Sequence, residues 1–223
     1  VGAAGERLKL DPRGALGRAV DHAIAGLRRL AVFLVDVHLL AAGAGLLGER
    51  RLDRALEHVG HAEDFRKKHK ENGLEFGITR IGVLTGAAAV GNFGPKTRLR
   101  YTAQGDAVNA ASRLEGLNKQ FGTHICVAGE TRELCKYMLF REIASVILKG
   151  KTRPTMVWEP LHPGSRGAET VDRYRAAFAK AAARDPAAKE MFASLAADAP
   201  DDSCIRWHAK RLAEGHQGVE IKM

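Results

Sequence analysis

The sequence is poor in aromatic residues and in cysteine. Phe, Trp and Tyr together make up 6% of its 223 residues, and the cysteines number 3, at Cys126, Cys135 and Cys204. A few scattered cysteines without a C-x-x-C pair exclude a disulfide framework and a structural zinc site, and they favour a reducing compartment. The first residues show no signal-peptide pattern. We therefore expect a cytoplasmic location, with the cytoplasmic face of a membrane as a variant of it.

Long hydrophobic runs are also scarce. The one stretch that approaches the length of a membrane span covers residues 30–48, and it contains Asp36 and His38 near its middle. A charged group at the centre of a bilayer is costly, so a buried helix or a strand-and-turn segment is favoured over a span. We expect membrane contact only through an upstream segment or a partner.

Apolar and basic residues are plentiful. The apolar fraction is 45% and the formal net charge is +9. A packed core is therefore expected and disorder is not. The basic excess fits an anionic partner such as a nucleotide, nucleic acid or acidic lipid, but it equally fits a solvated surface. Charge alone does not choose between them.

The hydrophobic period changes along the chain. Residues 1–48 are loosely helical from residue 15 onward, and apolar residues at three- and four-residue spacing predict a helix over 50–72. Strands are predicted at 78–84, 87–90, 99–103 and 124–128, and a β-pair at 140–148 and 155–161. A helix is predicted from Asp106, as its N-cap, to Gln120, with a stop at Gly122, and a short helix over 130–136.

The C-terminal part is helical again. Residues 171–215 show three apolar stripes, with spacings typical of a helical-hairpin repeat of about 34 residues. One copy is too short for a solenoid, so we expect a helical cap packed on the preceding domain. The predicted units are 1–48, an uncertain helical or apolar segment; 49–162, the central domain; and 163–223, a repeat-like helical extension.

Two side chains of the central helix carry a chemical signal. Asn109 and Arg113 are four residues apart and share one helix face. An amide can hold a ribose oxygen, and a guanidinium can meet phosphate oxygens with its planar fork. An ordinary amphipathic helix whose Asn and Arg face water explains the same spacing.

Three longer runs resemble a known family. They are TRIGVLTGAAAVGNFG from Thr79, YTAQGDAVNAASRLEGLNKQFGTHICVAGET from Tyr101 and LKGKTRPTMVWEPL from Leu148. In order and spacing they are similar to the C-terminal half of the class III adenylate/guanylate cyclase catalytic domain, in particular that of bacterial sensor-linked cyclases. The resemblance implies an α+β, ferredoxin-like nucleotide cyclase sandwich with a C-terminal helical extension, incomplete at its N-terminal side.

The resemblance also implies a reaction and a set of site residues. The family converts ATP or GTP into the 3′,5′-cyclic monophosphate and pyrophosphate with Mg²⁺ or Mn²⁺, in cyclic-nucleotide signalling. At the matched positions, Asn109 is expected to orient the ribose and Arg113 to stabilise charge at the α-phosphate. Lys149 is expected to bind the terminal phosphates, and Thr102 to lie where the family recognises the base.

The family's two metal-binding aspartates are not recognisable. Asp36, within Phe-Leu-Val-Asp-Val, is a weak match to the first, and Ala44 stands where the second is expected. Without two carboxylates these hard cations lack their oxygen ligands. In this family the site lies between two chains, so this chain is expected to supply only the half that holds Asn109, Arg113 and Lys149.

Three interpretations remain open. The leading one is a truncated class III cyclase domain that makes cyclic AMP. The second is an inactive pseudo-cyclase that binds nucleotide or pairs with a complete cyclase, and the third is a basic helical adaptor. The expected partners are ATP or GTP and a second chain, in a homodimer or in a heterodimer with a complete cyclase, and no nucleic acid. Missing N-terminal strands would leave an exposed sheet edge that a partner could cover.

Overall fold

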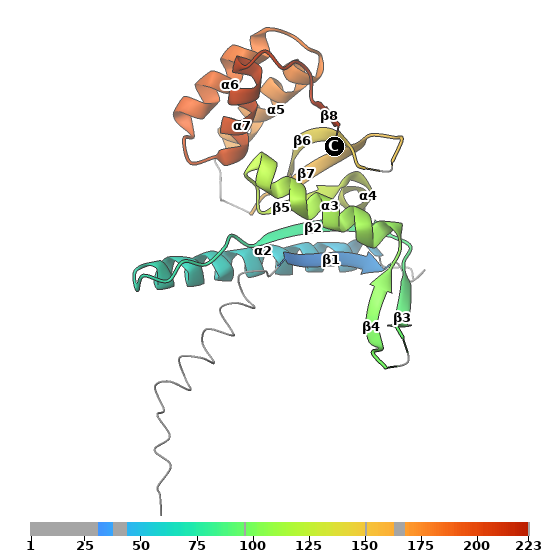
Figure 1. The fold of residues 1–223 in the computed structure, drawn as a ribbon. Coiled ribbons are helices and arrows are strands. Elements are labelled where there is room, and N and C mark those ends of the chain that lie inside the picture. Colours follow the sequence, from blue (N-terminus) through green and yellow to red (C-terminus); the bar gives the residue numbers. More distant parts are fainter. Residues whose placement is uncertain (1–30, 38–43, 96, 150, 163–167, 223) are drawn as a thin grey trace, which may run out of the picture.

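The fold is a mixed sheet with helices on both of its faces (Figure 1). The computed structural model describes residues 31–37, 44–95, 97–149, 151–162 and 168–222. Six strands form the main sheet in the order β1-β2-β5-β7-β6-β8, and β3 and β4 form a separate pair. The expected α+β class with a mixed sheet is confirmed.

The first three elements form a β-α-β unit. β1 (Ala31–Val37) lies parallel to β2 (Arg80–Gly86), and α2 (Ala44–Lys70) connects them. Parallel neighbours require such a crossover. The expected loosely helical character is wrong for residues 31–37, because this valine-rich segment pairs along the whole of β2. One N-terminal strand therefore lies at the edge that we expected to be exposed.

Two other expectations concern the same region. Helix α2 begins six residues before the predicted start at 50. Within the described part of the chain, no helix is long and apolar enough to cross a membrane. The part of the predicted helical segment that covers residues 1–30 lies outside the described residues.

A two-stranded hairpin projects from the sheet (Figure 1). β3 (Ala89–Phe93) pairs with β4 (Arg100–Gln104) in antiparallel register, so that Gly91 lies opposite Thr102. The strand predicted at 87–90 lies further along the chain, since it begins at Ala89 and residues 91–93 belong to it. Its pairing partner is β4.

Helix α3 (Asp106–Phe121) packs closely on β2. A Cβ atom at Gly82 would lie 2.1 Å from the carbonyl oxygen of Ala111 and 2.4 Å from the amide nitrogen of Glu115. Buried Asn118 donates a hydrogen bond to the carbonyl oxygen of Ile81 (2.9 Å). The helix ends as predicted at Gly122, whose φ of 72° suits glycine.

The two faces of the sheet carry different helices. β5 (Ile125–Ala128) is buried on both sides: Cys126 and Ala128 pack in a core with α3, whereas Ile125 and Val127 pack in a core with α2. The short helix α4 (Gly129–Leu134) follows β5 and packs beside α2. The chain that leaves β5 therefore moves to the face opposite α3.

The predicted C-terminal helices pack onto the α3 face. α5 (Ala168–Ala182), α6 (Ala187–Asp198) and α7 (Ser203–Ala213) share one apolar core with α3, β5, β6 (Phe140–Ile147) and β7 (Thr155–Pro160). β8 (Glu220–Lys222) then pairs parallel to β6. The division of the chain at residues 48 and 162 stays a prediction.

A buried ionic cluster joins α7 to the β6–β7 hairpin. Arg141 on β6 donates two hydrogen bonds to Asp202, of 2.6 and 3.0 Å, and one of 2.6 Å to Glu159 on β7. Asp202 also accepts from the amides of Cys204 and Ile205 as the N-cap of α7. A buried guanidinium with its charge paired and hydrogen-bonded avoids the desolvation penalty of an isolated ion.

His208 lies at the centre of the helical extension and is 1% exposed. Its Nε2 is 3.2 Å from the hydroxyl oxygen of Tyr174, and that hydroxyl donates to the carbonyl oxygen of Glu142 (2.6 Å). Burial, reinforced by the nearby positive charges of Arg141 and Arg211, lowers the pKa of His208 to about 3. The imidazole is therefore neutral in the folded protein at neutral pH.

Replacing Gly82 with alanine tests the contact between β2 and α3. We expect Gly82→Ala to lower the free energy of unfolding by about 1–3 kcal/mol, because the new methyl meets helix backbone that cannot yield locally. Gly60→Ala is the matched control, since open space surrounds Gly60 on α2. Urea unfolding of both variants measures the difference, and equal midpoints would contradict this account of the packing.

Acid pH tests the buried histidine. Between pH 6.5 and about 3 the unfolded chain binds a proton at His208 that the folded chain does not bind. Stability should therefore fall as the pH falls below 6.5, by up to about 1.4 kcal/mol per pH unit from this group. His208→Phe should flatten this dependence of the melting temperature on pH, whereas replacement of exposed His61 by Gln should leave it in place.

Candidate functional site

Helix α3 presents two of the predicted site residues. Asn109 is exposed and Arg113 is half-buried, one turn apart on the helix. Neither side chain forms a hydrogen bond or ion pair with another residue in the described part of the chain. Both polar groups are therefore available to an external ligand.

The other two predicted binding residues lie on hairpins. Lys149 is exposed in the turn between β6 and β7, and Thr102 is exposed on β4. The β4 strand runs directly into α3 through Gln104 and Gly105, so Thr102 precedes the start of the helix that carries Asn109.

The expectation that Asp106 caps α3 is wrong. The N-cap is Gly105, with a φ of 146°, and no side chain caps the helix. Asp106 instead accepts a hydrogen bond from Lys151 (2.9 Å), and this contact holds the pKa of its carboxyl group below the ordinary value. The ion pair ties the β6–β7 turn to the N-terminus of the helix.

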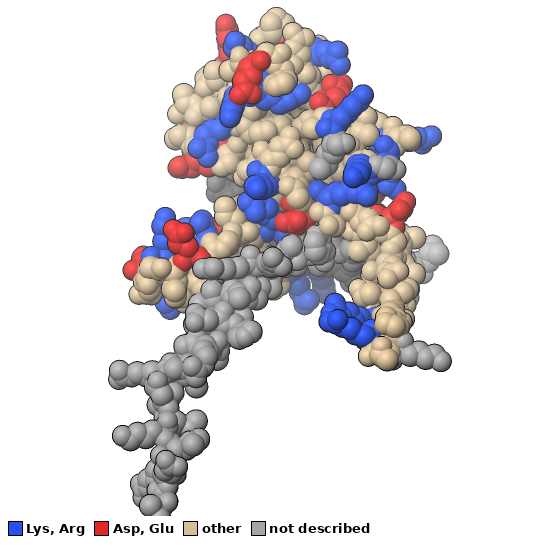
Figure 2. Space-filling model, in the orientation of Figure 1, with Lys and Arg blue, Asp and Glu red and all other residues tan. Residues whose placement is uncertain are grey.

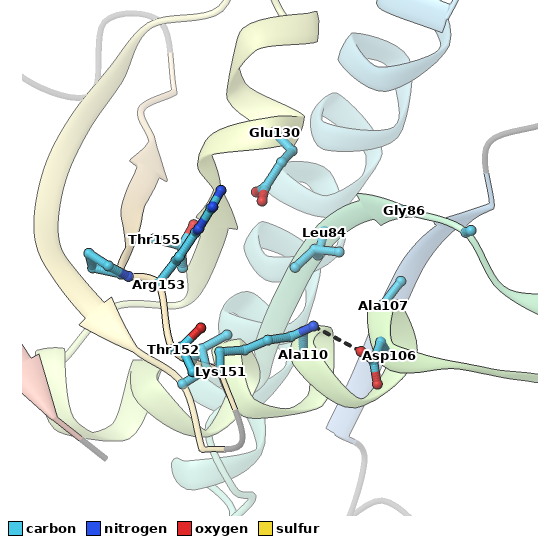
Figure 3. A pocket seen from close by; sticks show the side chains of 13 residues that line it. Leu84, Gly86, Asp106, Ala107, Ala110, Glu130, Lys151, Thr152, Arg153 and Thr155 are labelled. Atoms are coloured by element: carbon cyan, nitrogen blue, oxygen red, sulfur yellow. Dashed lines mark hydrogen bonds and ion pairs between the residues drawn. The ribbon is translucent and has the colours of Figure 1, made fainter.

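A pocket of about 580 Å³ opens beside this ion pair (Figure 3). It lies between the end of β2, the first turns of α3, the start of α4 and the β6–β7 turn. Its lining residues are Leu84, Gly86, Ala87, Asp106, Ala107, Ala110, Glu130, Leu148, Lys151, Thr152, Arg153, Pro154 and Thr155. None of the predicted site residues Thr102, Asn109, Arg113 and Lys149 is among them.

Sequence reasoning did not find the charged groups of this pocket. Glu130 extends into it from α4 and Arg153 from the segment that precedes β7 (Figure 3), and neither forms an ion pair or hydrogen bond within the described residues. In the sequence, Glu130 opens a short helix and Arg153 follows a basic turn, and both contexts are typical of solvated charges. No spacing signal connects residues from separate elements.

The described residues do not provide a site for a divalent metal ion. No group of three or more His, Cys, Asp and Glu side chains comes together among them. Asp36 lies near the end of β1, with Thr85 as its partner on β2, and its side chain is outside the described part. Since Mg²⁺ and Mn²⁺ need several oxygen ligands, this donor set does not fit either ion.

Basic side chains are spread over the face seen in Figure 2. Lys and Arg side chains gather around the β6–β7 turn and beside the β3–β4 hairpin, with acidic side chains between them. The β6–β7 turn, which carries Lys149, and the β3–β4 hairpin, which carries Thr102, therefore lie among mainly basic side chains with a few acidic ones. An excess of positive charge favours a polyanionic ligand at close range.

Comparisons with known proteins agree on one family. The model of the adenylate and guanylate cyclase catalytic domain matches residues 49–159. Over 98 residues the chain is 43% identical to adenylate cyclase 1 of Rhizobium meliloti (strain 1021). This alignment covers 44% of this chain and 15% of that protein. It is 37% identical over 83 residues to adenylate cyclase of Anabaena cylindrica, covering 35% of this chain and 16% of that protein. The chain thus spans only a small part of these relatives.

A solved structure is also similar. The adenylyl cyclase CyaB from P. aeruginosa matches with a TM-score of 0.49 at 23% identity, over 72% of this chain and 87% of that chain. The range that the family model matches, residues 49–159, includes Asn109 and Arg113.

Proposed function

Through residues 49–159 the chain belongs to the adenylate and guanylate cyclase catalytic domain family, and from this we propose that it supplies the ribose- and phosphate-binding half of a site that cyclises ATP. We propose that the chain forms part of a class III adenylate cyclase catalytic domain. The observation that carries the proposal is the pair of unpartnered side chains, Asn109 and Arg113, on one face of α3 inside the matched region.

The chemistry needs a small number of positioned polar groups. The ribose 3′-oxygen forms a bond to the α-phosphorus, the bond from phosphorus to the pyrophosphate oxygen breaks, and the 3′-hydroxyl proton is lost to solvent or a base. Negative charge grows on the phosphorus oxygens and on the leaving group. Such a reaction gains mainly from positioning and from fixed positive charge near those oxygens.

Each predicted residue has one role in this proposal. Asn109 holds a ribose oxygen, so that the 3′-oxygen stays in line with the phosphorus. Arg113 donates hydrogen bonds to the α-phosphate as its charge grows, and its planar fork suits two oxygens at once. Lys149 binds the terminal phosphates as a point charge from the turn between β6 and β7.

A second chain completes the site in this proposal. The family generally uses Mg²⁺ or Mn²⁺, and the described residues of this chain do not fit either ion. A complete cyclase chain would bring the metal-binding carboxylates to Asn109 and Arg113 in a heterodimer. A pseudo-cyclase that only binds nucleotide or regulates its partner is the second candidate.

The choice of base rests on Thr102. Its exposed hydroxyl on β4 can exchange a hydrogen bond with a purine edge. ATP is the substrate that we propose, with GTP as the alternative, and the cytoplasm is the compartment. The substrate ATP, the alternative GTP and the cytoplasmic compartment are parts of this proposal.

Complementation tests the role of Arg113. The catalytic domain of adenylate cyclase 1 from Rhizobium meliloti, with its matching Asn and Arg replaced by Ala, serves as a partner that lacks this half-site. We expect cyclic AMP from ATP and Mn²⁺ when the two chains are mixed, and about 10²–10³-fold less with Arg113→Ala, the size typical of a lost charge-stabilising donor. Arg206→Ala, an exposed change on α7, is the matched control.

The outcomes of this assay separate the two candidates. Failure to restore turnover, although sedimentation shows that the two chains associate, would reject the catalytic proposal and leave the pseudo-cyclase. Turnover by this chain alone that Arg113→Ala abolishes would show that residues outside the described part bind the metal. Turnover that Arg113→Ala leaves unchanged would refute the assignment of this residue.

Lys149 can be tested in the same mixture. We expect Lys149→Ala to raise the KM for ATP by about tenfold with a smaller change in kcat, because a contact to the terminal phosphates is made in both ground and transition states. Lys119→Ala removes an exposed charge from the last turn of α3 and controls for net charge. An equal rise in KM for both variants would indicate general attraction of ATP instead.

A further inference from the structure

The pocket between α3, α4 and the β6–β7 turn lies at a special place in the sheet. β2 and β5 run parallel and end at Gly86 and Ala128. After β2 the chain forms the β3–β4 hairpin and then returns as α3 on one face, and after β5 it continues as α4 on the opposite face. Where successive parallel strands send their helices to opposite faces, a crevice opens at the carboxyl ends of the strands, and ligands commonly bind there.

The size and floor of the pocket suit a small organic molecule. Its volume of about 580 Å³ falls within the range of about 300–1,000 Å³ for ligand pockets. The small side chains of Ala107 and Ala110 leave space above α3, and Leu84, Leu148 and Pro154 complete an apolar lining. This lining would bury an apolar body of a ligand.

The charges around this floor are not equivalent. At one side of the pocket the ammonium group of Lys151 and the carboxylate of Asp106 form an ion pair, with 2.9 Å between Nζ and Oδ2. Glu130 and Arg153 both reach into the pocket (Figure 3) and form no ion pair, with each other or with any other described residue. One unpaired carboxylate and one unpaired guanidinium thus face the same space.

We propose that this pocket binds a small zwitterion with an apolar body, its ammonium group directed to Glu130 and its carboxylate to Arg153. The planar guanidinium accommodates a carboxylate with two parallel hydrogen bonds. A simple anion would also face the like charge of Glu130, and a simple cation would face that of Arg153. An amino-acid-like ligand meets both charges favourably.

This site is separate from the proposed ATP half-site. Thr102, Asn109, Arg113 and Lys149 do not line the pocket. The ligand would nevertheless contact the same elements, since Ala107 and Ala110 flank Asn109 on α3 and residues 151–155 follow Lys149. Binding can be measured without nucleotide, so its outcome does not depend on the cyclase proposal.

Three probes that share a phenyl ring test the charge requirement. They are L-phenylalanine, phenethylamine, which lacks the carboxylate, and 3-phenylpropionate, which lacks the ammonium group. Isothermal titration of the whole chain should show that L-phenylalanine binds about tenfold more tightly than either of the others, as expected for one lost charge-assisted contact. Equal affinities for the three probes, or no saturable binding of L-phenylalanine, would overturn the proposal.

Two variants assign each charge to its residue. Glu130→Gln should erase the advantage of L-phenylalanine over 3-phenylpropionate, and Arg153→Gln should erase its advantage over phenethylamine. Both residues are exposed, so the fold should be kept, which far-UV circular dichroism checks. Glu133→Gln on α4 and Arg54→Gln on α2 are matched controls outside the pocket, and an equal loss in these controls would refute the assignment.

Discussion

The close contact between helix α3 and strand β2 is the constraint on which the candidate site depends. Gly82 has no side chain where the helix backbone approaches β2 closely, and Asn118 donates a hydrogen bond to the carbonyl oxygen of Ile81. Because α3 carries Asn109, Arg113 and part of the pocket lining, its position on the sheet sets the place of all of them. Interiors are too densely packed for this contact to adjust without moving the helix.

The β6–β7 hairpin is the second fixed element around the site. Arg141 on β6 attaches it to Asp202, the N-cap of α7, in the interior, and it also bonds Glu159 on β7. Lys151 attaches the turn of the hairpin to Asp106 at the surface. The two ion pairs differ in how strongly they hold the hairpin. The Arg141–Asp202 pair is buried and hydrogen-bonded, whereas the Lys151–Asp106 pair is exposed to water and screened by salt. The helical extension is therefore packed against the base of the hairpin that carries Lys149.

Much of the fold was readable from the sequence. The apolar period predicted α3 to within one residue, α2 except for its first six residues, and three apolar stripes in the region of α5, α6 and α7. The runs around Asn109, Arg113 and Lys149 indicated the family that the comparisons confirm. The misses have local causes. Residues 31–37 form a strand because this valine-rich segment pairs along β2. Asp106 pairs with Lys151 and does not cap α3.

What the sequence alone determined is therefore the chemistry that lies along one helix or one turn: the amide and guanidinium of Asn109 and Arg113, spaced by a single helical turn, and the exposed charge of Lys149. Only the tertiary structure decided what residues from separate elements form together. Glu130 and Arg153 lie on different elements. The pocket between them lies where β5 ends at Ala128 and the next helix, α4, packs on the face opposite α3. Periodicity records which face of an element is buried, but not which other element lies against it.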